Sequence, residues 1–206
     1  MTSRVYFPFL TNFKVYRISA IGDGSCFFHA LLLGFVIPYI EEKYEDGSKF
    51  NRVEFTKKFR KIIANTLYQK DDSGKILYDK LANGNLKDLA KHGGFGEKYK
   101  LSNFYEWLKS SRSVGLEAIE VTSRYIKRNI LILSVNNSDV YKIGTVGDTY
   151  NPKLPSIVLL YTQNITGDDG HFDLCGIRKD GKIITHFSPK NDFIREILNR
   201  NLNLEH

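Results

Sequence analysis

Hydrophobic positions in the first two thirds of the chain follow helical spacing. Residues 26–36 are too densely apolar for an exposed helix, so they predict a buried helix that starts at Ser25 or Cys26. Apolar side chains then recur every three to four residues between Phe55 and Leu67, which predicts an amphipathic helix over about residues 52–68. The pattern predicts further helices near residues 76–89, 103–109 and 116–127.

Short apolar runs rich in β-branched residues mark the later part of the chain as strands. Residues 129–135 and 156–161 predict buried strands. Further strands are predicted over residues 140–143, 171–177 and 182–187, with an Asp180-Gly181 hairpin between the last two. Residues 5–21 are aromatic-rich and irregular, with only some alternation around residues 13–16. Helices therefore come first and strands later, which predicts an α+β fold with helices packed on a mixed or mainly antiparallel sheet.

Composition narrows the class of protein. A chain of 206 residues with 42 % hydrophobic residues suits one folded domain, expected over residues 1–203. The last three residues, Leu204-Glu205-His206, resemble the remnant of a cloning scar and tag, and they carry no functional expectation. With two cysteines, the sequence excludes a disulfide scaffold and a four-cysteine zinc site.

Hydropathy and charge indicate the cellular compartment of the protein and the kinds of partner that it could bind. The longest apolar run, residues 30–39, has about half the length that crosses a bilayer, so no membrane span is expected. The first residues show no signal-peptide pattern, and an intracellular, reducing compartment is expected. The net charge is +7, and the densest basic stretch, residues 52–61, carries apolar residues at helical spacing. We interpret that stretch as a solvated helix face, with a binding patch for an acidic partner as the alternative.

The chemistry of the sequence centres on Cys26. Gly22 and Gly24 allow a sharp turn directly before the predicted helix, and backbone N–H groups converge in such a turn. The helix start adds unpaired N–H donors and partial positive charge, which should lower the pKa of a thiol and can hold a tetrahedral oxyanion. A nucleophilic Cys26 and a small, buried, hydrophobic Cys26 both fit this pattern.

A thiol nucleophile needs a base, and His171 has the most favourable pattern among the histidines. It opens a predicted strand in which Asp173 shares its face, so the acid can hold the imidazole in the required tautomer. Cys175 shares that face but lies about 13 Å from His171 along a strand, and we interpret it as structural. Lesser candidates for the base are His29, His92 and His186.

Three segments together resemble the ovarian tumour (OTU) family of cysteine deubiquitinases. Residues 23–30, Asp-Gly-Ser-Cys-Phe-Phe-His-Ala, are similar to the nucleophile motif of that family, and His171-Phe172-Asp173 is similar to its histidine motif. A softer match runs from Gly115 through a helix into the apolar strand at residues 129–132. The resemblance covers roughly residues 15–187. The family often has a tryptophan just before the Gly115 position, where this chain has Ser113-Val114, and residues 71–100 have no counterpart.

The resemblance implies a papain-like OTU fold and hydrolysis of the isopeptide bond at the ubiquitin C-terminus. Cys26 is then the nucleophile, His171 the general base and later the acid, and Asp173 the residue that orients His171. Asp23 opens the oxyanion turn together with Gly24, and the backbone N–H groups of Asp23 and Cys26 are the expected donors. The family uses no metal and no cofactor.

The implied partner is ubiquitin or polyubiquitin, with ubiquitin-like modifiers as further candidates, and a monomer is expected. A Gly-Gly terminus suits a narrow channel, expected along residues 110–117 and 162–170, and the expected substrate contacts are Gly115, Glu117, Gly170 and Phe172. A compact enzyme of this kind would fit a viral or bacterial protein that acts in the host cytosol. The alternatives are a ubiquitin-binding module without strong catalysis, another papain-like hydrolase and a basic nucleic-acid-binding domain.

Overall fold

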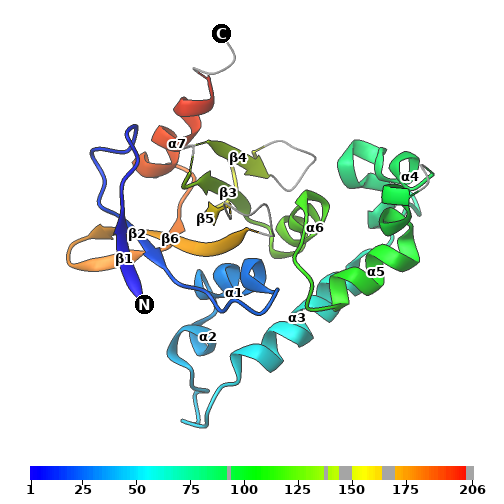
Figure 1. Ribbon diagram of the computed structural model, residues 1–206, viewed down its shortest axis with the longest axis horizontal. Helices are drawn as coiled ribbons and strands as arrows, with labels where there is room; N and C mark the ends of the chain where they lie inside the picture. The colour runs from blue at the N-terminus through cyan, green and yellow to red at the C-terminus, as the bar shows by residue number, and fades with distance from the viewer. Residues whose placement is uncertain (92–93, 137–138, 144–149, 164–169, 203–206) are drawn as a thin grey trace.

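The computed structural model describes the whole chain except residues 92–93, 137–138, 144–149, 164–169 and 203–206. Its strands form one mixed sheet in the order β1-β2-β6-β5-β3-β4, with β7 paired to β6 and β8 paired to β5 (Figure 1). β3 and β5 run parallel, and every other described pair is antiparallel. The strands are β1 (Thr2–Val5), β2 (Val15–Ile18), β3 (Asn129–Ser134), β4 (Val140–Ile143), β5 (Ser156–Thr162), β6 (His171–Lys179), β7 (Lys182–Ile184) and β8 (His186–Phe187).

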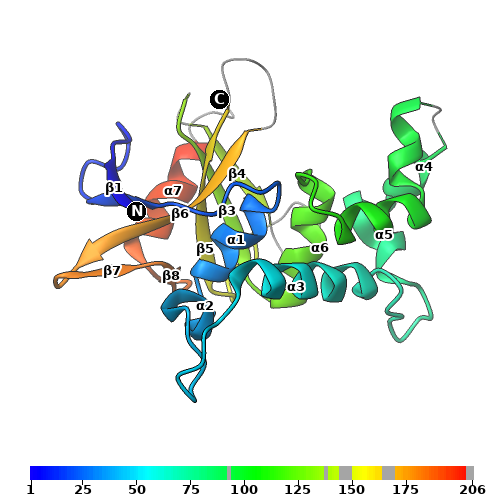
Figure 2. The same cartoon turned by 60° about the horizontal axis from the view of Figure 1, so that its bottom comes forward.

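Alternation along the central strands separates two hydrophobic cores. In β3, Ile130 and Ile132 face the first core, whereas Leu131 and Leu133 face the second. The helices α1 (Cys26–Leu33) and α6 (Leu116–Ile126) pack on the first face, and α3 (Arg52–Thr66) and α5 (Leu101–Lys109) lie outside them (Figure 2). The helix α7 (Asp192–Leu202) covers the second face. The predicted α+β class is confirmed.

The strongest periodic patterns produced the predicted helices. The buried helix of the nucleophile motif is α1, and the amphipathic helix is α3, whose Phe59 and Ile63 are buried. The lysines of the basic stretch on α3 are exposed, as expected for a solvated face. Arg60 is the exception: it is 1 % exposed, so the interpretation as a solvated face was wrong for this residue.

Between α3 and α5 the chain forms short helical elements that extend to one side of the molecule (Figure 1). The single helix predicted near residues 76–89 is wrong, because a 3₁₀ helix, η1 (Leu77–Gly84), gives way to the short α4 (Leu86–Leu89). Ala82 and Asn83 have left-handed φ values of 49° and 55°, which interrupt the helix. The Ala82 N–H donates to Glu120 Oε2 at 2.9 Å, so α6 holds this kink in place. A second 3₁₀ helix, η2 (Gly94–Tyr99), precedes α5.

The two ends of the described chain departed from prediction. Residues 5–21 do not stay irregular: β2 pairs with both β1 and β6, so the expected order of helices first and strands later was wrong. These strands have four residues each and no fully buried face, so their alternation is weak. The helices α2 (Ile37–Glu41) and α7 were also not predicted.

The Asp180-Gly181 hairpin is confirmed, with φ values of 49° and 77° at the turn. Among the described residues, no helix combines the length and the apolar character needed to span a membrane.

Candidate active site

Cys26 is the first residue of α1 and follows a turn that depends on glycine. Gly24 has a φ of +82°, and a Cβ there would lie 2.0 Å from the Ser111 carbonyl oxygen. The turn therefore packs directly against the segment that follows α5. Ser25 occupies the N-cap position and makes no side-chain capping bond. The first N–H groups of α1 have no acceptor within the helix, which makes them available as donors near the thiol.

The Cys26 thiol faces the start of β6. Cys26 is 6 % exposed. Burial raises the pKa of its thiol, and the backbone N–H groups of Phe172 and Phe27 act in the opposite direction by hydrogen bonding to the sulfur. The net direction is upward, so the expectation that the helix start lowers the pKa of this thiol is not met. Phe172 stands between His171 and Asp173, so the two motifs meet here although they lie far apart in sequence.

His171 and Asp173 share one face of β6, as strand alternation predicts. His171 Nε2 lies 3.1 Å from Asp173 Oδ1, which leaves Nδ1 for a second partner. The imidazole lies over Gly22: its Cε1 and Nδ1 are 3.6 and 3.9 Å from the point that a Cβ of Gly22 would occupy. Because Gly22 belongs to the turn before Cys26, Nδ1 lies beside the segment that presents the thiol.

Two further groups hold the Asp173 carboxylate, and neither was anticipated from the sequence. The Ala20 N–H donates to Oδ1 at 2.9 Å, and Arg17 Nε lies 3.4 Å from Oδ2. Arg17 also donates to Thr162 Oγ1 at 3.1 Å, so it joins β2 to the end of β5. The Asp173 side chain is only 6 % exposed. The pairing of β2 with β6 is the signal that would have identified Arg17, and that pairing was not predicted.

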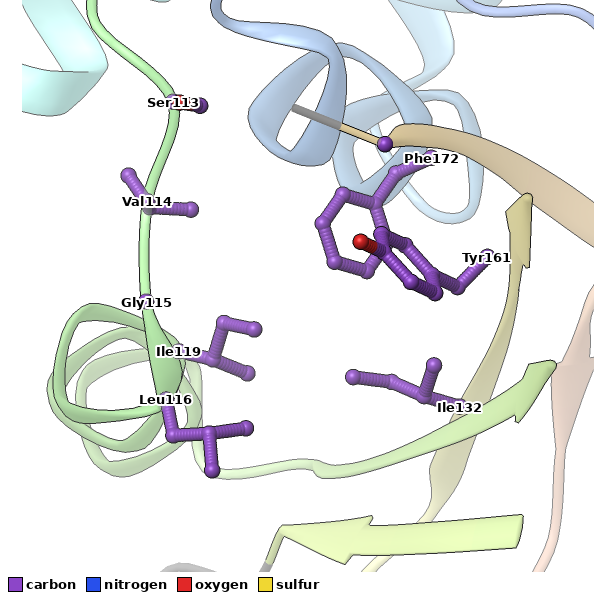
Figure 3. A pocket seen from close by; sticks show the side chains of 9 residues that line it. Ser113, Val114, Gly115, Leu116, Ile119, Ile132, Tyr161 and Phe172 are labelled. Carbon is purple, nitrogen blue, oxygen red and sulfur yellow. The ribbon is translucent and has the colours of Figure 1, made fainter. Parts of the chain in front are cut away.

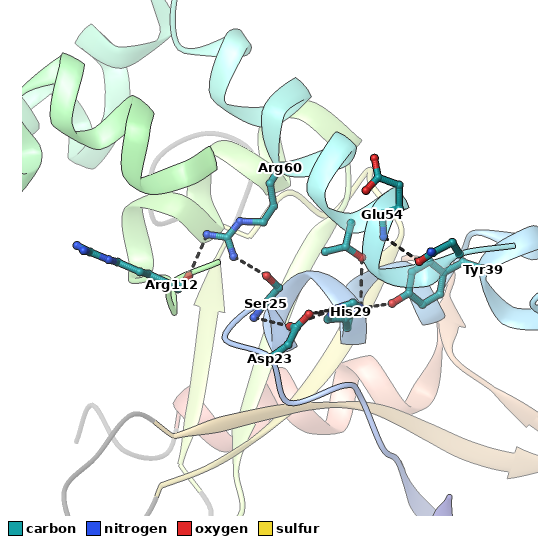
Figure 4. Close-up of polar contacts among 9 residues, drawn as sticks. Asp23, Ser25, His29, Tyr39, Glu54, Arg60 and Arg112 are labelled. Atoms are coloured by element: carbon teal, nitrogen blue, oxygen red, sulfur yellow. Dashed lines mark hydrogen bonds and ion pairs between the residues drawn. The ribbon is translucent and has the colours of Figure 1, made fainter. Parts of the chain in front are cut away.

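Asp23 builds the turn through its carboxylate (Figure 4). Its Oδ1 accepts the Ser25 N–H at 2.9 Å, and both carboxylate oxygens lie 3.1 Å from His29 Nε2. Partial burial raises the pKa of Asp23, but the bonds from Ser25 and His29 outweigh it, so the net pKa lies below its ordinary value. His29 is completely buried, and its Nδ1 contacts the hydroxyl groups of Tyr39 and Thr56. With both ring nitrogens engaged, His29 supports the turn and is not placed to serve as the base.

The remaining candidates do not join the site. His186 lies in β8, which pairs with the start of β5, whereas His171 pairs with Thr162 at the end of β5. Its Nε2 accepts a bond from Arg128 at 3.1 Å. His92 lies outside the described residues. Cys175 is completely buried in the second core, as its structural interpretation requires, and burial raises the pKa of its thiol strongly.

A groove of about 220 Å³ begins beside the histidine motif (Figure 3). Gly115 and Leu116, at the start of α6, form one side, and Tyr161 and Phe172 form the other. Its lining is Ser113, Val114, Gly115, Leu116, Ile119, Ile132, Tyr161, Gly170 and Phe172. Three of the four predicted substrate contacts therefore lie along it. Glu117 does not line it, although its Oε2 is 3.2 Å from the point that a Cβ of Gly115 would occupy.

A tryptophan supports one wall of this groove from an unexpected position. Trp107, in α5, donates from Nε1 to the Ser113 carbonyl oxygen at 3.0 Å. Its ring atom Cη2 lies 3.5 Å from the point that a Cβ of Gly115 would occupy. The indole thus lies against residues 113–115, although it stands six to eight residues before them in sequence. The described residues contain no cluster of His, Cys, Asp and Glu side chains that could hold a metal ion.

Taken together, the site offers a thiol, an imidazole oriented by a carboxylate, and backbone N–H donors at a helix start. This combination is suited to acyl transfer through a covalent thioester. Of the channel segment expected along residues 162–170, residues 164–169 lie outside the described part of the chain, so the groove is defined here by its other lining residues.

Comparison with known proteins finds similarity in structure alone. No protein-family model matches the sequence, and no curated protein matches it. A solved OTU domain in complex with ubiquitin is similar with a TM-score of 0.56 and 14 % identity, over 92 % of this chain and 84 % of that one. The Hazara virus OTU bound to ubiquitin has a TM-score of 0.48 and 15 % identity, over 86 % and 89 % of the two chains. For an OTU deubiquitinase from Wolbachia pipientis wMel the values are 0.48 and 12 %, over 90 % and 96 %. On the first of these comparisons, the protein has the fold of an OTU domain.

Proposed function

We propose that the protein is a thiol isopeptidase that cleaves the bond between the C-terminal glycine of ubiquitin and a lysine or a linear peptide. The observation that carries this proposal is the meeting of Cys26 with the histidine motif. The Phe172 backbone N–H acts on the Cys26 thiol and lowers its pKa, and the neighbouring His171 is 3.1 Å from its orienting acid. The fold shared with an OTU domain solved in complex with ubiquitin supports ubiquitin as the partner.

Acylation of Cys26 is the first half of the proposed reaction. His171 accepts the thiol proton on Nδ1, and the thiolate attacks the carbonyl carbon of the terminal glycine. This transfer is needed because burial raises the pKa of the Cys26 thiol, so the thiol is protonated near neutral pH. Asp173 stabilises the resulting imidazolium through Nε2. The tetrahedral intermediate collapses when the C–N bond breaks, and His171 returns the proton to the departing amine.

Deacylation completes the cycle. A water molecule gives a proton to His171 and attacks the thioester carbonyl. The C–S bond then breaks, which releases the ubiquitin carboxylate and restores the Cys26 thiol. Both steps develop negative charge on the same carbonyl oxygen. Backbone N–H groups of the turn at Asp23 and of Cys26 are the proposed donors, and loss of one such donor costs about 3–4 kcal/mol in studied enzymes.

The groove supplies a reason for selecting a Gly-Gly terminus. Gly115 and Gly170 line it beside the histidine motif, and a Cβ at Gly170 would lie 2.4 Å from the Tyr161 ring. A larger residue at Gly170 would therefore displace the Tyr161 side of the groove, and a terminus of two glycines needs the least room beside it. We therefore assign Gly115, Gly170 and Phe172 to contacts with the ubiquitin tail, and the host cytosol is the proposed place of action.

The direct test is turnover of ubiquitin that carries a C-terminal fluorogenic amide. Cys26→Ala should reduce kcat/KM by at least about 10³-fold and leave the fold intact, because it removes only the nucleophile. The matched control is Cys175→Ala, which removes the other thiol and should keep turnover while losing some stability. Retained turnover in Cys26→Ala, measured with a near-native circular dichroism spectrum, would refute the proposal.

Ubiquitin with a C-terminal electrophile separates catalysis from mere binding. The wild-type protein should form one covalent adduct at Cys26, detected by mass spectrometry, and Cys26→Ala should form none. A binding module would retain ubiquitin without forming the adduct. Cleavage of unrelated peptides at the rate of ubiquitin would point instead to a general papain-like hydrolase.

A further inference from the structure

Arg60 is the largest of the fully buried side chains in the part of the chain that the structure describes. It projects from the middle of α3 toward the turn that precedes Cys26 (Figure 4). No described carboxylate forms an ion pair with it. A buried guanidinium without such a partner is costly unless neutral acceptors satisfy its donors. The groups that accept hydrogen bonds from Arg60 therefore indicate the role of this buried charge.

Among the described residues, the side-chain hydrogen bonds of Arg60 go to two segments, the turn before Cys26 and residues 107–112. On the nucleophile side, Arg60 Nη1 donates to Ser25 Oγ at 3.0 Å, and the guanidinium carbon lies 4.6 Å from the centre of the Phe28 ring. On the other side the acceptors are backbone carbonyl oxygens. They are those of Leu108 at 2.8 Å, Arg112 at 2.9 Å and Trp107 at 3.3 Å.

The second segment is the one that forms a wall of the groove. Trp107 and Leu108 belong to the last turn of α5, whose carbonyl groups carry partial negative charge, and the Trp107 carbonyl oxygen also accepts from the Ser110 hydroxyl at 2.7 Å. The chain then continues through Ser111, which contacts Gly24, into the groove residues Ser113 and Gly115. Arg60 thus connects the residue before the nucleophile to the segment that shapes the groove.

The charge of Arg60 also acts on the thiol. Burial lowers the pKa of Arg60 to about 10, and the negative charges of Asp23 and Cys26 act in the opposite direction. The attraction between Arg60 and a Cys26 thiolate is mutual, so it favours ionisation of the thiol. Asp173 on β6 acts on Cys26 in the opposite direction, because its negative charge raises the pKa of the thiol. The other titratable groups of the site are Asp23, whose carboxylate accepts the Ser25 N–H, and His171, which lies beside Asp173.

We propose that Arg60 is a positioning residue: its guanidinium fixes the Ser25–Cys26 turn against residues 107–112, and its charge favours the thiolate form of Cys26. It does not touch the reacting atoms. The two effects differ in what they require. Fixing the two segments needs the planar fork with its several donors, whereas favouring the thiolate needs only a positive charge. This inference rests on the proposed function for its turnover measurement alone.

Two substitutions separate these effects. Arg60→Met keeps most of the volume and loses the charge, whereas Arg60→Lys keeps the charge and loses the fork. The first measurement is the rate of Cys26 alkylation by iodoacetamide between pH 6 and 10, followed by peptide mass spectrometry. Arg60→Met should slow alkylation about tenfold at pH 7 and move the half-maximal rate to higher pH, as expected for loss of one nearby charge. Arg60→Lys should keep the wild-type pH profile.

The second measurement is turnover of the fluorogenic ubiquitin amide. Both variants should lose kcat, by about tenfold or more, because neither can bridge Ser25 and the three carbonyl groups. Arg52→Met is the matched control. Arg52 lies on the same helix, pairs with Glu42, donates to the Tyr39 and Ile40 carbonyl oxygens and lies over the Tyr39 ring. None of these contacts is with Ser25, Cys26 or residues 107–112. It should reduce stability without altering the alkylation profile.

The outcomes are distinguishable from failure of the proposed function. Alkylation uses no ubiquitin, so its pH profile reports on Arg60 even if the protein cleaves no ubiquitin conjugate. An unchanged alkylation profile and unchanged turnover in folded Arg60→Lys and Arg60→Met would overturn the inference. If Arg60→Met does not fold, Arg60→Lys alone tests the positioning role. Wild-type turnover in Arg60→Lys would overturn that role.

Discussion

Single side chains at the candidate site differ in how firmly the fold holds them. Asp173 is held most firmly, because His171, Ala20 and Arg17 all contact its carboxylate. A carboxylate fixed from several sides cannot rotate away from the imidazole, and its charge stays next to Nε2. The orienting role assigned to Asp173 therefore depends on its charge as well as on its shape.

Asp173→Asn tests that dependence. The amide preserves the shape but loses the negative charge that stabilises the imidazolium, so kcat should fall by about 10²-fold or more with a small change in KM. Steady-state kinetics with the fluorogenic ubiquitin amide measure both constants. Arg17→Met is the control: it leaves Asp173 charged but less firmly held, and kcat should fall less. Full activity in Asp173→Asn would mean that another acid orients His171.

His29 couples the nucleophile turn to the pH dependence of stability. Burial lowers the pKa of His29, and the hydrogen bond to Asp23 only partly offsets it. The unfolded chain therefore binds a proton at higher pH than the folded protein. By linkage, the free energy of unfolding falls as the pH drops below the unfolded value of about 6.5, by at most about 1.4 kcal/mol per pH unit for one histidine. Urea denaturation at pH 7.5 and pH 5.5 measures this loss.

His29→Gln should flatten that loss, because glutamine can still donate to Asp23 but does not titrate. Asp23 does not contribute to the difference between pH 7.5 and pH 5.5. Its pKa is lowered in the folded protein, so its contribution to the free energy of unfolding is lost only below about pH 4. The pKa of His186 is lowered too, through burial and Arg128, so part of the wild-type slope should persist. A slope in His29→Gln equal to that of the wild type would contradict the prediction.

At the residue scale, local chemistry decided what could be predicted from sequence. Cys26 follows a glycine turn, and His171 and Asp173 lie two positions apart on one strand. The residues next to them in sequence are therefore enough to suggest their chemical roles. Arg17 and Arg60 act through contacts that span most of the chain or bridge separate helices. Nothing within a few residues of either distinguishes it from a surface arginine.

At the scale of elements, the site depends on close approach between two loops. The turn before α1 contacts the segment after α5 where Gly24 meets Ser111. Gly24→Ala should destabilise the protein in two ways: a positive φ costs about 1–2 kcal/mol for alanine, and the clash with Ser111 adds about 1–3 kcal/mol. Turnover should fall as well, because the displaced turn carries the proposed oxyanion donors.

Gly47→Ala isolates the contribution of the contact. Gly47 has a φ of +81°, nearly that of Gly24, but nothing lies within 4 Å of the point that its Cβ would occupy. It should therefore show only the cost of the positive φ and keep full turnover. Urea unfolding and the fluorogenic assay compare the two variants directly. Equal losses in both would show that the contact with Ser111 contributes nothing.

The elements that were predicted correctly are those whose burial is visible in their own sequence. α1 and β3 are apolar nearly throughout, and α3 repeats apolar residues over several turns. The elements that were missed obtain their stability from partners. β2 is a short strand held between β1 and β6, and the predicted helix near residues 76–89 is divided by a kink that α6 stabilises.

At the scale of the whole molecule, β6 joins the candidate site to both cores. Phe172 and Leu174 face the first core, whereas Cys175 and Ile177 face the second. β6 also pairs with β5 and β2, which lie on its two sides. His171 and Asp173 are thus fixed by an element that both halves of the molecule share. Disruption of either core should displace them.

Cys175 provides a probe of that cooperativity. It is completely buried in the middle of β6, so alkylation requires an opening that separates α7 from the sheet. In Cys26→Ala, where Cys175 is the remaining thiol, labelling in native buffer should be at least about 10³-fold slower than in urea, given ordinary domain stabilities. If β6 opens only with the whole molecule, the logarithm of the labelling rate should rise with urea at a slope matching the equilibrium m-value. Rapid labelling that does not depend on urea would instead mean that β6 opens locally, and the shared element would then not fix the histidine motif.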